Sequence, residues 1–328
     1  MELSFHDRIR ARQAIKDAVR QHMFDPNVNL IDVGYRIQAG NRLVPELAVR
    51  FHLHTKLQGA RFESFAEEQP ERVIPPAIGG FPTDVIQSSY HLSLMTAVAQ
   101  PEAVWAGDPR TRVMSPMQGG ISISDAYAGG YGTLGGLVYD KTTGEEMLLS
   151  NYHVLAGSGW ASPRTTIIQP GRGDGGREPV ATFVRHAMNN GIDAAVARLN
   201  GSRALSHYQY MLGPLSGVAE PQLGMKVIKS GRASGITRGL VTAIEGVVKL
   251  NYRSGERLIR HVCHIVPIGN VGQVSAPVIW VVLAGMPTRA RSRGLHFAGA
   301  DQPGIRPSNQ HEQRGSRVRC GCGNRVME

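Results

Sequence analysis

Short apolar runs separated by turns containing glycine and proline recur along most of this chain. In residues 132–157, one apolar run at 134–139 is followed by a polar turn at 140–144 and a second apolar run at 147–149. Two such runs joined by a short polar turn are typical of a β-hairpin. Because similar short runs continue to about residue 301, the pattern predicts a mostly β fold.

A helical period stands out only near the amino terminus. In residues 6–24 the apolar side chains Ile15, Val19 and Met23 share one helical face. Basic side chains lie elsewhere on the same helix, at Arg8, Arg12, Lys16 and Arg20. The pattern predicts an amphipathic helix that docks on the protein, and a helix that binds a membrane or an anionic partner is the alternative.

Two strands are expected next, at residues 31–40 and 46–53. In the second, Val49, Phe51 and Leu53 alternate with polar residues, which predicts one buried and one exposed face. His52 and His54 share the polar face. A metal would need a third ligand, and none is visible nearby in the sequence, so we expect an exposed strand face.

Residues 89–118 show no regular spacing of apolar residues, and a linker is expected there. We therefore divide the chain into a small α+β module at residues 1–88, the linker at 89–118, a β domain at 119–301 and a tail at 302–328. The tail is polar, rich in arginine and nearly free of large apolar residues, and it is expected to be disordered.

Composition narrows the classes of function. The 328 residues carry a formal charge of +10, which keeps nucleic-acid binding as an alternative, although no stripe of basic and aromatic residues appears. The three cysteines, Cys263, Cys320 and Cys322, are too few for a disulfide framework. There is no secretory signal and no apolar run of about 18 residues, so we expect a soluble cytoplasmic protein without a membrane partner.

Two segments carry candidate chemistry. Ser150-Asn-Tyr-His-Val-Leu155 places His153 directly after the predicted returning strand, and about forty residues later Asp193 precedes a run of small apolar residues. A carboxylate buried in such a run needs a hydrogen-bond donor, and the Nδ1 hydrogen of an imidazole is suitable. His153 is a candidate for that donor, and a turn aspartate that caps a strand is the alternative. No cofactor is expected; a zinc site that combines Cys320 and Cys322 with His261, Cys263 and His264 is an alternative, but C-x-C is not the usual knuckle spacing.

These segments resemble the chymotrypsin-like serine proteases of the PA clan. The resemblance implies a domain of two β-barrels, endopeptidase activity on polypeptide substrates, His153 as general base and Asp193 as its orienter. The stretch from Lys229 to Gly239 resembles the second-barrel signature K-x-G-R-x-[ST]-G-x-T-x-G. The first third of the chain resembles the module that precedes the barrels in a bacterial branch related to the plant Narrow leaf 1 protein.

The sequence departs from the pattern of that family at the segment that carries the nucleophile. The sequence contains no Gly-Asp-Ser-Gly, the loop that carries the family's serine and oxyanion donors. At the expected place it reads Val274-Ser-Ala-Pro-Val278, in which Ser275 is the nearest hydroxyl and has no glycine beside it. We therefore expect an inactive protease homologue. The alternative function is peptide binding by strand addition near residues 294–299.

Overall fold

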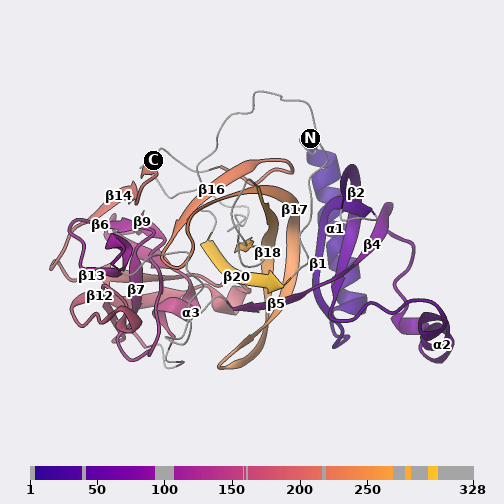
Figure 1. The fold of residues 1–328 in the computed structure, drawn as a ribbon, viewed down its shortest axis with the longest axis horizontal. Coiled ribbons are helices and arrows are strands. Elements are labelled where there is room, and N and C mark those ends of the chain that lie inside the picture. The colour runs from indigo at the N-terminus through magenta and orange to yellow at the C-terminus, as the bar shows by residue number, and fades with distance from the viewer. Residues whose placement is uncertain are drawn as a thin grey trace.

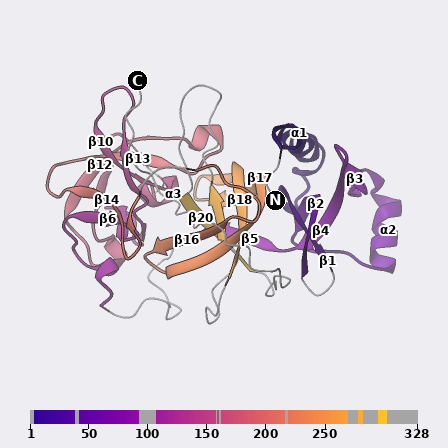
Figure 2. The ribbon, with the colours of Figure 1, turned by 90° about the horizontal axis from the view of Figure 1, so that it is seen from above.

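The computed structural model describes residues 4–38, 42–92, 107–157, 159, 162–215, 219–268, 278–281 and 295–301. The protein is mostly β, as predicted. Three parts follow one another along its longest axis (Figure 1): strands of a first sheet, then the long strands β16 to β18, then the amino-terminal helix and strands. The view from above also places β16 to β18 in the middle (Figure 2).

Strands outnumber helices throughout the described residues. The helices and 3-10 turns are α1 Phe5–His22, α2 Ala60–Glu68, η1 Pro70–Arg72, η2 Pro109–Thr111, α3 Tyr152–Leu155, η3 Arg172–Asp174 and η4 Met188–Asn190. The first strands are β1 Val28–Gln38, β2 Arg42–Leu53, β3 Ala77–Ile78, β4 Phe81–Gln87, β5 Ser89–Leu92, β6 Met117–Gly119, β7 Ser122–Asp125, β8 Gly132–Thr133, β9 Gly136–Tyr139 and β10 Glu146–Ser150. The remaining strands are β11 Thr166–Ile168, β12 Pro179–His186, β13 Ala195–Leu199, β14 Leu205–Gln209, β15 Gly213–Pro214, β16 Lys226–Gly231, β17 Gly235–Tyr252, β18 Gly255–Pro267, β19 Val278–Val281 and β20 Leu295–Asp301.

Helix α1 forms as its apolar period predicts. The side chain of Ser4 caps its first turn by accepting the N–H of Asp7. Ile15, Val19 and Met23 are buried against the amino-terminal strands, so α1 docks on the protein. Among the helices of the described residues, none is long and apolar enough to cross a membrane.

The amino-terminal strands belong to the same sheet as the second half of the chain. The order β3-β4-β2-β1-β17-β18-β19-β20-β5 forms one sheet, and β16 pairs with β17. The joint is antiparallel pairing of β1 with β17, in which Leu30 lies opposite Val248 and Val33 opposite Ile244. Strand β5 lies inside the stretch expected to be a linker and pairs with β20. The first 88 residues are thus continuous with the later strands by backbone hydrogen bonding.

The prediction that one face of β2 is exposed is wrong. Arg50 and His52 are fully buried, whereas His54, just beyond the end of the strand, is exposed. The physical reason is that both faces of β2 are covered. Phe51 packs in the cluster beneath α1, while the face that carries Arg50 and His52 meets side chains of β5 and β18.

Charged and aromatic side chains fill the covered polar face. Arg50 lies opposite Asp32 of β1 and binds it through two hydrogen bonds, Nε to Oδ1 at 2.6 Å and Nη2 to Oδ2 at 2.7 Å. The hydroxyl of Tyr90 lies 2.7 Å from Nδ1 of His52, and the His52 and His264 rings are 5.5 Å apart between centroids. We call Asp32, Arg50, His52, Tyr90 and His264 the buried polar cluster.

The seven-stranded sheet, which we call the first sheet, is separate from the sheet that contains β1 and β17, which we call the second sheet. The first sheet has its own core. It runs β8-β7-β11-β12-β13-β10-β9, with a small sheet β15-β14-β6 beside it. Its interior is apolar and is built around Ile123, Leu134, Leu148 and Phe183, all buried. The stretch near residues 294–299, named above as a place for strand addition, overlaps β20. Ser275, Cys320, Cys322 and the tail at 302–328 lie outside the described residues.

Replacing Asp32 by Asn should destabilise the protein by about 3–5 kcal/mol, because the buried Arg50 guanidinium loses its counter-charge. The measurement is urea unfolding followed by circular dichroism. Glu46→Gln is the matched control, because Arg36 and Glu46 form an exposed ion pair between the same two strands. Its expected cost is about 0–1 kcal/mol. Equal costs for the two variants would contradict the structural role of the buried pair.

Stability should fall as the pH drops below about 6.5, the ordinary histidine value. Burial lowers the pKa of His52 and of His264 in the folded protein, and the charge of Arg50 lowers the pKa of His264 further. The unfolded chain therefore takes up protons first, and stability is lost progressively toward the folded pKa. Below about 4 the lowered pKa of Asp32 adds a second loss.

The check is the urea midpoint between about pH 8 and pH 5. His264→Asn should flatten this dependence, because it removes a titrating ring while keeping a polar group beside Thr242, whose Oγ1 lies 2.8 Å from Nδ1 of His264. The exposed His207→Asn should leave it unchanged. A pH dependence as steep in His264→Asn as in the unmodified protein would argue against this ring as a source.

Candidate active site

The pairing of β10 with β13 brings His153 and Asp193 together. Ser150, the last residue of β10, lies opposite Ala195, the first residue of β13. The short helix α3 then carries His153 back over the strand ends, and Asp193 comes two residues before Ala195. Because both residues are fixed to one pair of hydrogen-bonded strands, their approach follows from local structure.

The imidazole and the carboxylate are hydrogen-bonded to each other. Nδ1 of His153 lies 2.5 Å from Oδ2 of Asp193, and the backbone N–H of His153 donates to Oδ1 at 3.1 Å. Asn151 fixes the same loop by donating its side-chain amide to the carbonyl of Asp193 at 2.9 Å. Asp193 is 0% exposed and His153 is 6% exposed. The expected proximity of the two residues is confirmed, and their catalytic role stays a prediction.

A third residue reaches the pair from the other sheet. Tyr252, at the end of β17, donates its hydroxyl to Oδ2 of Asp193 at 3.1 Å. Burial and the negative charge of Asp193 raise the pKa of Tyr252 far above its ordinary value, so the hydroxyl keeps its proton and remains a donor. The sequence offered no local signal for this contact, because Tyr252 lies 59 positions from Asp193.

The hairpin that carries Tyr252 also holds the backbone of the aspartate loop. Arg260 of β18 donates its N–H to the carbonyl of Gly191 at 2.8 Å. Gly191 has a φ of 71°, and a Cβ on it would lie 3.0 Å from the carbonyl oxygen of Leu258. Glycine is therefore required at this position for both conformation and space. The second sheet thus fixes the loop that presents Asp193.

This arrangement suits a general base. A carboxylate that accepts the Nδ1 hydrogen holds the neutral imidazole in the tautomer whose Nε2 is an acceptor. Such a nitrogen can take the proton of an attacking hydroxyl, and the buried carboxylate stabilises the imidazolium that forms. Ser275, the nearest hydroxyl to the expected place of a nucleophile, lies outside the described residues.

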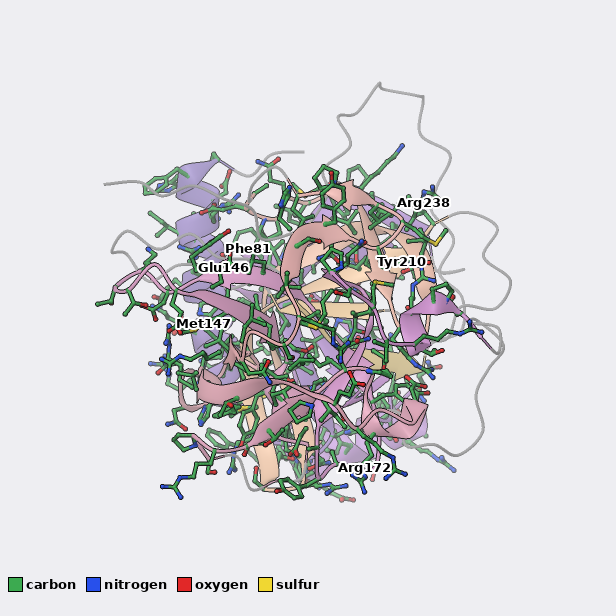
Figure 3. The ribbon with its side chains drawn as sticks, turned by 90° about the vertical axis from the view of Figure 1, so that its left-hand side faces the viewer. Phe81, Glu146, Met147, Arg172, Tyr210 and Arg238 are labelled. Carbon is green, nitrogen blue, oxygen red and sulfur yellow. The ribbon has the colours of Figure 1, made fainter. Side chains whose placement is uncertain are left out.

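Two other features of the sequence are the Arg-Gly-Asp tripeptide at residues 172–174 and the alternative zinc site. Arg172, in the Arg-Gly-Asp turn, is exposed and lies at the lower edge of the view in Figure 3. The carboxylate of Asp174 in the same turn binds Arg232 and Ser122, so this turn does not offer a free Arg-Gly-Asp motif. No group of three or more His, Cys, Asp or Glu residues suited to a metal ion occurs in the described part of the chain.

Replacing Tyr252 by Phe should cost about 1.5–3 kcal/mol, because a buried carboxylate loses a hydrogen bond. The measurement is urea unfolding, with the low-field proton resonance of the His153 Nδ1–H as a second readout that should move. The matched control is Tyr139→Phe, since the Tyr139 hydroxyl donates to Glu146 at 3.4 Å on the exposed end of a strand pair. A change within about 0.5 kcal/mol is expected there. An unmoved resonance in Tyr252→Phe would contradict the contact.

Comparison with known proteins gives similarity of structure only. No family model and no curated protein matches the chain, so the expected link to the Narrow leaf 1 branch stays a prediction. Similar solved structures include protease A of Thermobifida fusca, with 15% identity over 55% of this chain and 89% of that one, at a TM-score of 0.35. A chymotrypsin of Cellulomonas bogoriensis matches with 16% identity over 58% and 92%, at 0.33. The MamO protease domain of Magnetospirillum magneticum matches with 14% identity over 54% and 88%, at 0.27. The solved structures named here are thus proteases, one of them a chymotrypsin.

Proposed function

We propose that this chain is a homologue of serine endopeptidases in which His153 is the general base and Asp193 its orienter. We further propose that the chain, as its sequence stands, binds polypeptide without cleaving it at this pair. The observation that carries the first half is the 2.5 Å contact between Nδ1 of His153 and a fully buried aspartate. A buried carboxylate and an imidazole in this geometry are arranged for proton transfer.

The proposal that the chain does not cleave polypeptide at this pair rests on the sequence. No Gly-Asp-Ser-Gly occurs in the 328 residues, and that loop supplies both the nucleophile and the oxyanion donors in the family the chain resembles. A triad that lacks its nucleophile loses about a million-fold in kcat. His153 and Asp193 would then be a retained pair without a covalent step.

The expected place for strand addition needs a correction. Strand β20 pairs with β19 on one side, and from Ala298 to Asp301 it pairs with β5 on the other. A peptide therefore cannot add along this part of β20 without displacing β5. Addition would be limited to residues 295–297, because Leu295 and His296 pair with β19 and no strand of the described residues pairs with their other side.

The activity test places the missing loop back into the chain. Gly-Asp-Ser-Gly-Ser is inserted between Pro277 and Val278, and the protein is treated with a fluorophosphonate probe whose adducts are located by peptide mapping. We expect an adduct on the inserted serine, and His153→Ala should lower its rate of formation by about a thousandfold or more. Binding is measured in parallel on the unmodified chain by fluorescence polarisation of labelled casein.

The exposed His207→Ala is the matched control and should leave labelling of the inserted serine unchanged. Equal labelling in His153→Ala would contradict the base assignment. An adduct on Ser275 of the unmodified chain, lost in Ser275→Ala, would contradict the prediction that His153 and Asp193 are catalytically inactive. Absence of saturable casein binding would contradict the peptide-binding half of the proposal.

A further inference from the structure

The turn between β16 and β17 holds a lysine and a serine in direct contact. The two strands are in register from Lys229 opposite Thr237 to Gly231 opposite Gly235, so residues 232–234 close the hairpin. Nζ of Lys229 reaches along this hairpin and hydrogen-bonds to Oγ of Ser234. Both side chains are half-buried, so the pair is neither fully solvated nor sealed in the core.

Gly231 makes room for this contact. A Cβ built on it would lie 2.9 Å from Oγ of Ser234 and 3.2 Å from Nζ of Lys229. A side chain at this position would therefore press against both polar atoms. Because φ of Gly231 is not positive, the requirement for glycine is one of space alone.

The surroundings of Lys229 favour its neutral form. Burial, with a further contribution from the nearby charge of Arg110, lowers the pKa of Lys229 to about 8. The Arg110 guanidinium is itself held by Asp108 at 2.8 Å and lies over the ring of Tyr210, which Figure 3 labels. The carboxylates of Asp108 and Asp174 form ion pairs with Arg110 and Arg232, and none with Lys229 occurs among the described residues.

The turn is fixed to the first sheet, which holds the pair in place. Arg232 donates from Nε to Asp174 at 2.8 Å, and its guanidinium lies 3.5 Å from the centroid of the Tyr131 ring. Its backbone N–H donates to Oγ1 of Thr133 at 3.1 Å. The charge of Arg232 is thus paired with Asp174, and Lys229 is the cation in this turn that contacts a hydroxyl.

We propose that Ser234 and Lys229 form a nucleophile and general-base pair that accepts acyl groups from carboxylic esters, at a site separate from His153 and Asp193. A neutral amine hydrogen-bonded to a serine hydroxyl can act as its base. Nζ of Lys229 takes the hydroxyl proton as Oγ of Ser234 bonds to the carbonyl carbon. The bond to the leaving alkoxide then breaks, and the alkoxide receives the proton from Lys229. Water hydrolyses the resulting serine ester, which restores the hydroxyl and releases the acid.

The test uses the full chain and p-nitrophenyl acetate as the acyl donor. Peptide mapping should find an acetyl ester on Ser234, identified by its release with hydroxylamine, which leaves lysine amides intact. Its rate of formation should rise about tenfold for each unit of pH and level off above about pH 8, as Lys229 loses its proton. Ser234→Ala should abolish the ester. Lys229→Arg, which keeps the charge but supplies no base, should slow it by about a hundredfold or more.

Lys226→Arg is the matched control, because Lys226 is exposed on the same strand and should have no effect. His153→Ala should also leave the Ser234 ester unchanged, so a failure at Ser234 is distinct from failure of the proposed function. Circular dichroism melting of each variant shows whether it is folded; if Lys229→Arg does not fold, Lys229→Met is used. An acetyl amide on Lys229 without an ester on Ser234, equal ester formation after loss of Lys229, or no ester at all would each overturn the proposal.

Discussion

The antiparallel pairing of β1 with β17 is the constraint on which the rest of this structure depends. It joins the amino-terminal hairpin to a strand of 18 residues that also pairs with β16 and β18. β1 lies beside that strand and β2 lies beside β1. Helix α1 covers one face of β2, and side chains of β5 and β18 cover the other. Arg50 of β2 is therefore buried, and the carboxylate of Asp32 balances its charge.

The same long strand connects the turn of Lys229 and Ser234 to the candidate active site. One end of β17 lies at the turn that holds Lys229 and Ser234, and its other end carries Tyr252 to the carboxylate of Asp193. The aspartate loop is held by β10 and β13 on one side and by the β17 to β18 hairpin on the other. The geometry of His153 and Asp193 is therefore a property of two sheets, although both residues belong to the first.

How far the sequence predicts this structure depends on whether the signal is local. His153 and Asp193 could be predicted because each lies beside a short strand, in segments that resemble the base and acid segments of chymotrypsin-like serine proteases. Arg50 and His52 were assigned to an exposed face because alternation shows only that two faces differ, and it cannot show that a distant strand covers the polar one. Tyr252 had no signal at all. The Lys229 to Gly239 turn was found from its glycines, but the contact of Lys229 with Ser234 depends on side-chain direction across the hairpin.

The joint between β1 and β17 also sets the order in which this chain can fold during synthesis. Leu30 finds its partner in Val248, about 220 positions later in the chain. At ordinary rates of translation the ribosome needs on the order of ten seconds or more to make the intervening residues. Throughout that time β1 is a long strand with an unpaired edge and an Asp32 to Arg50 pair not yet covered. Such an edge is a template for pairing with another chain, so the newly made amino-terminal third presents this edge until its own later strands are made.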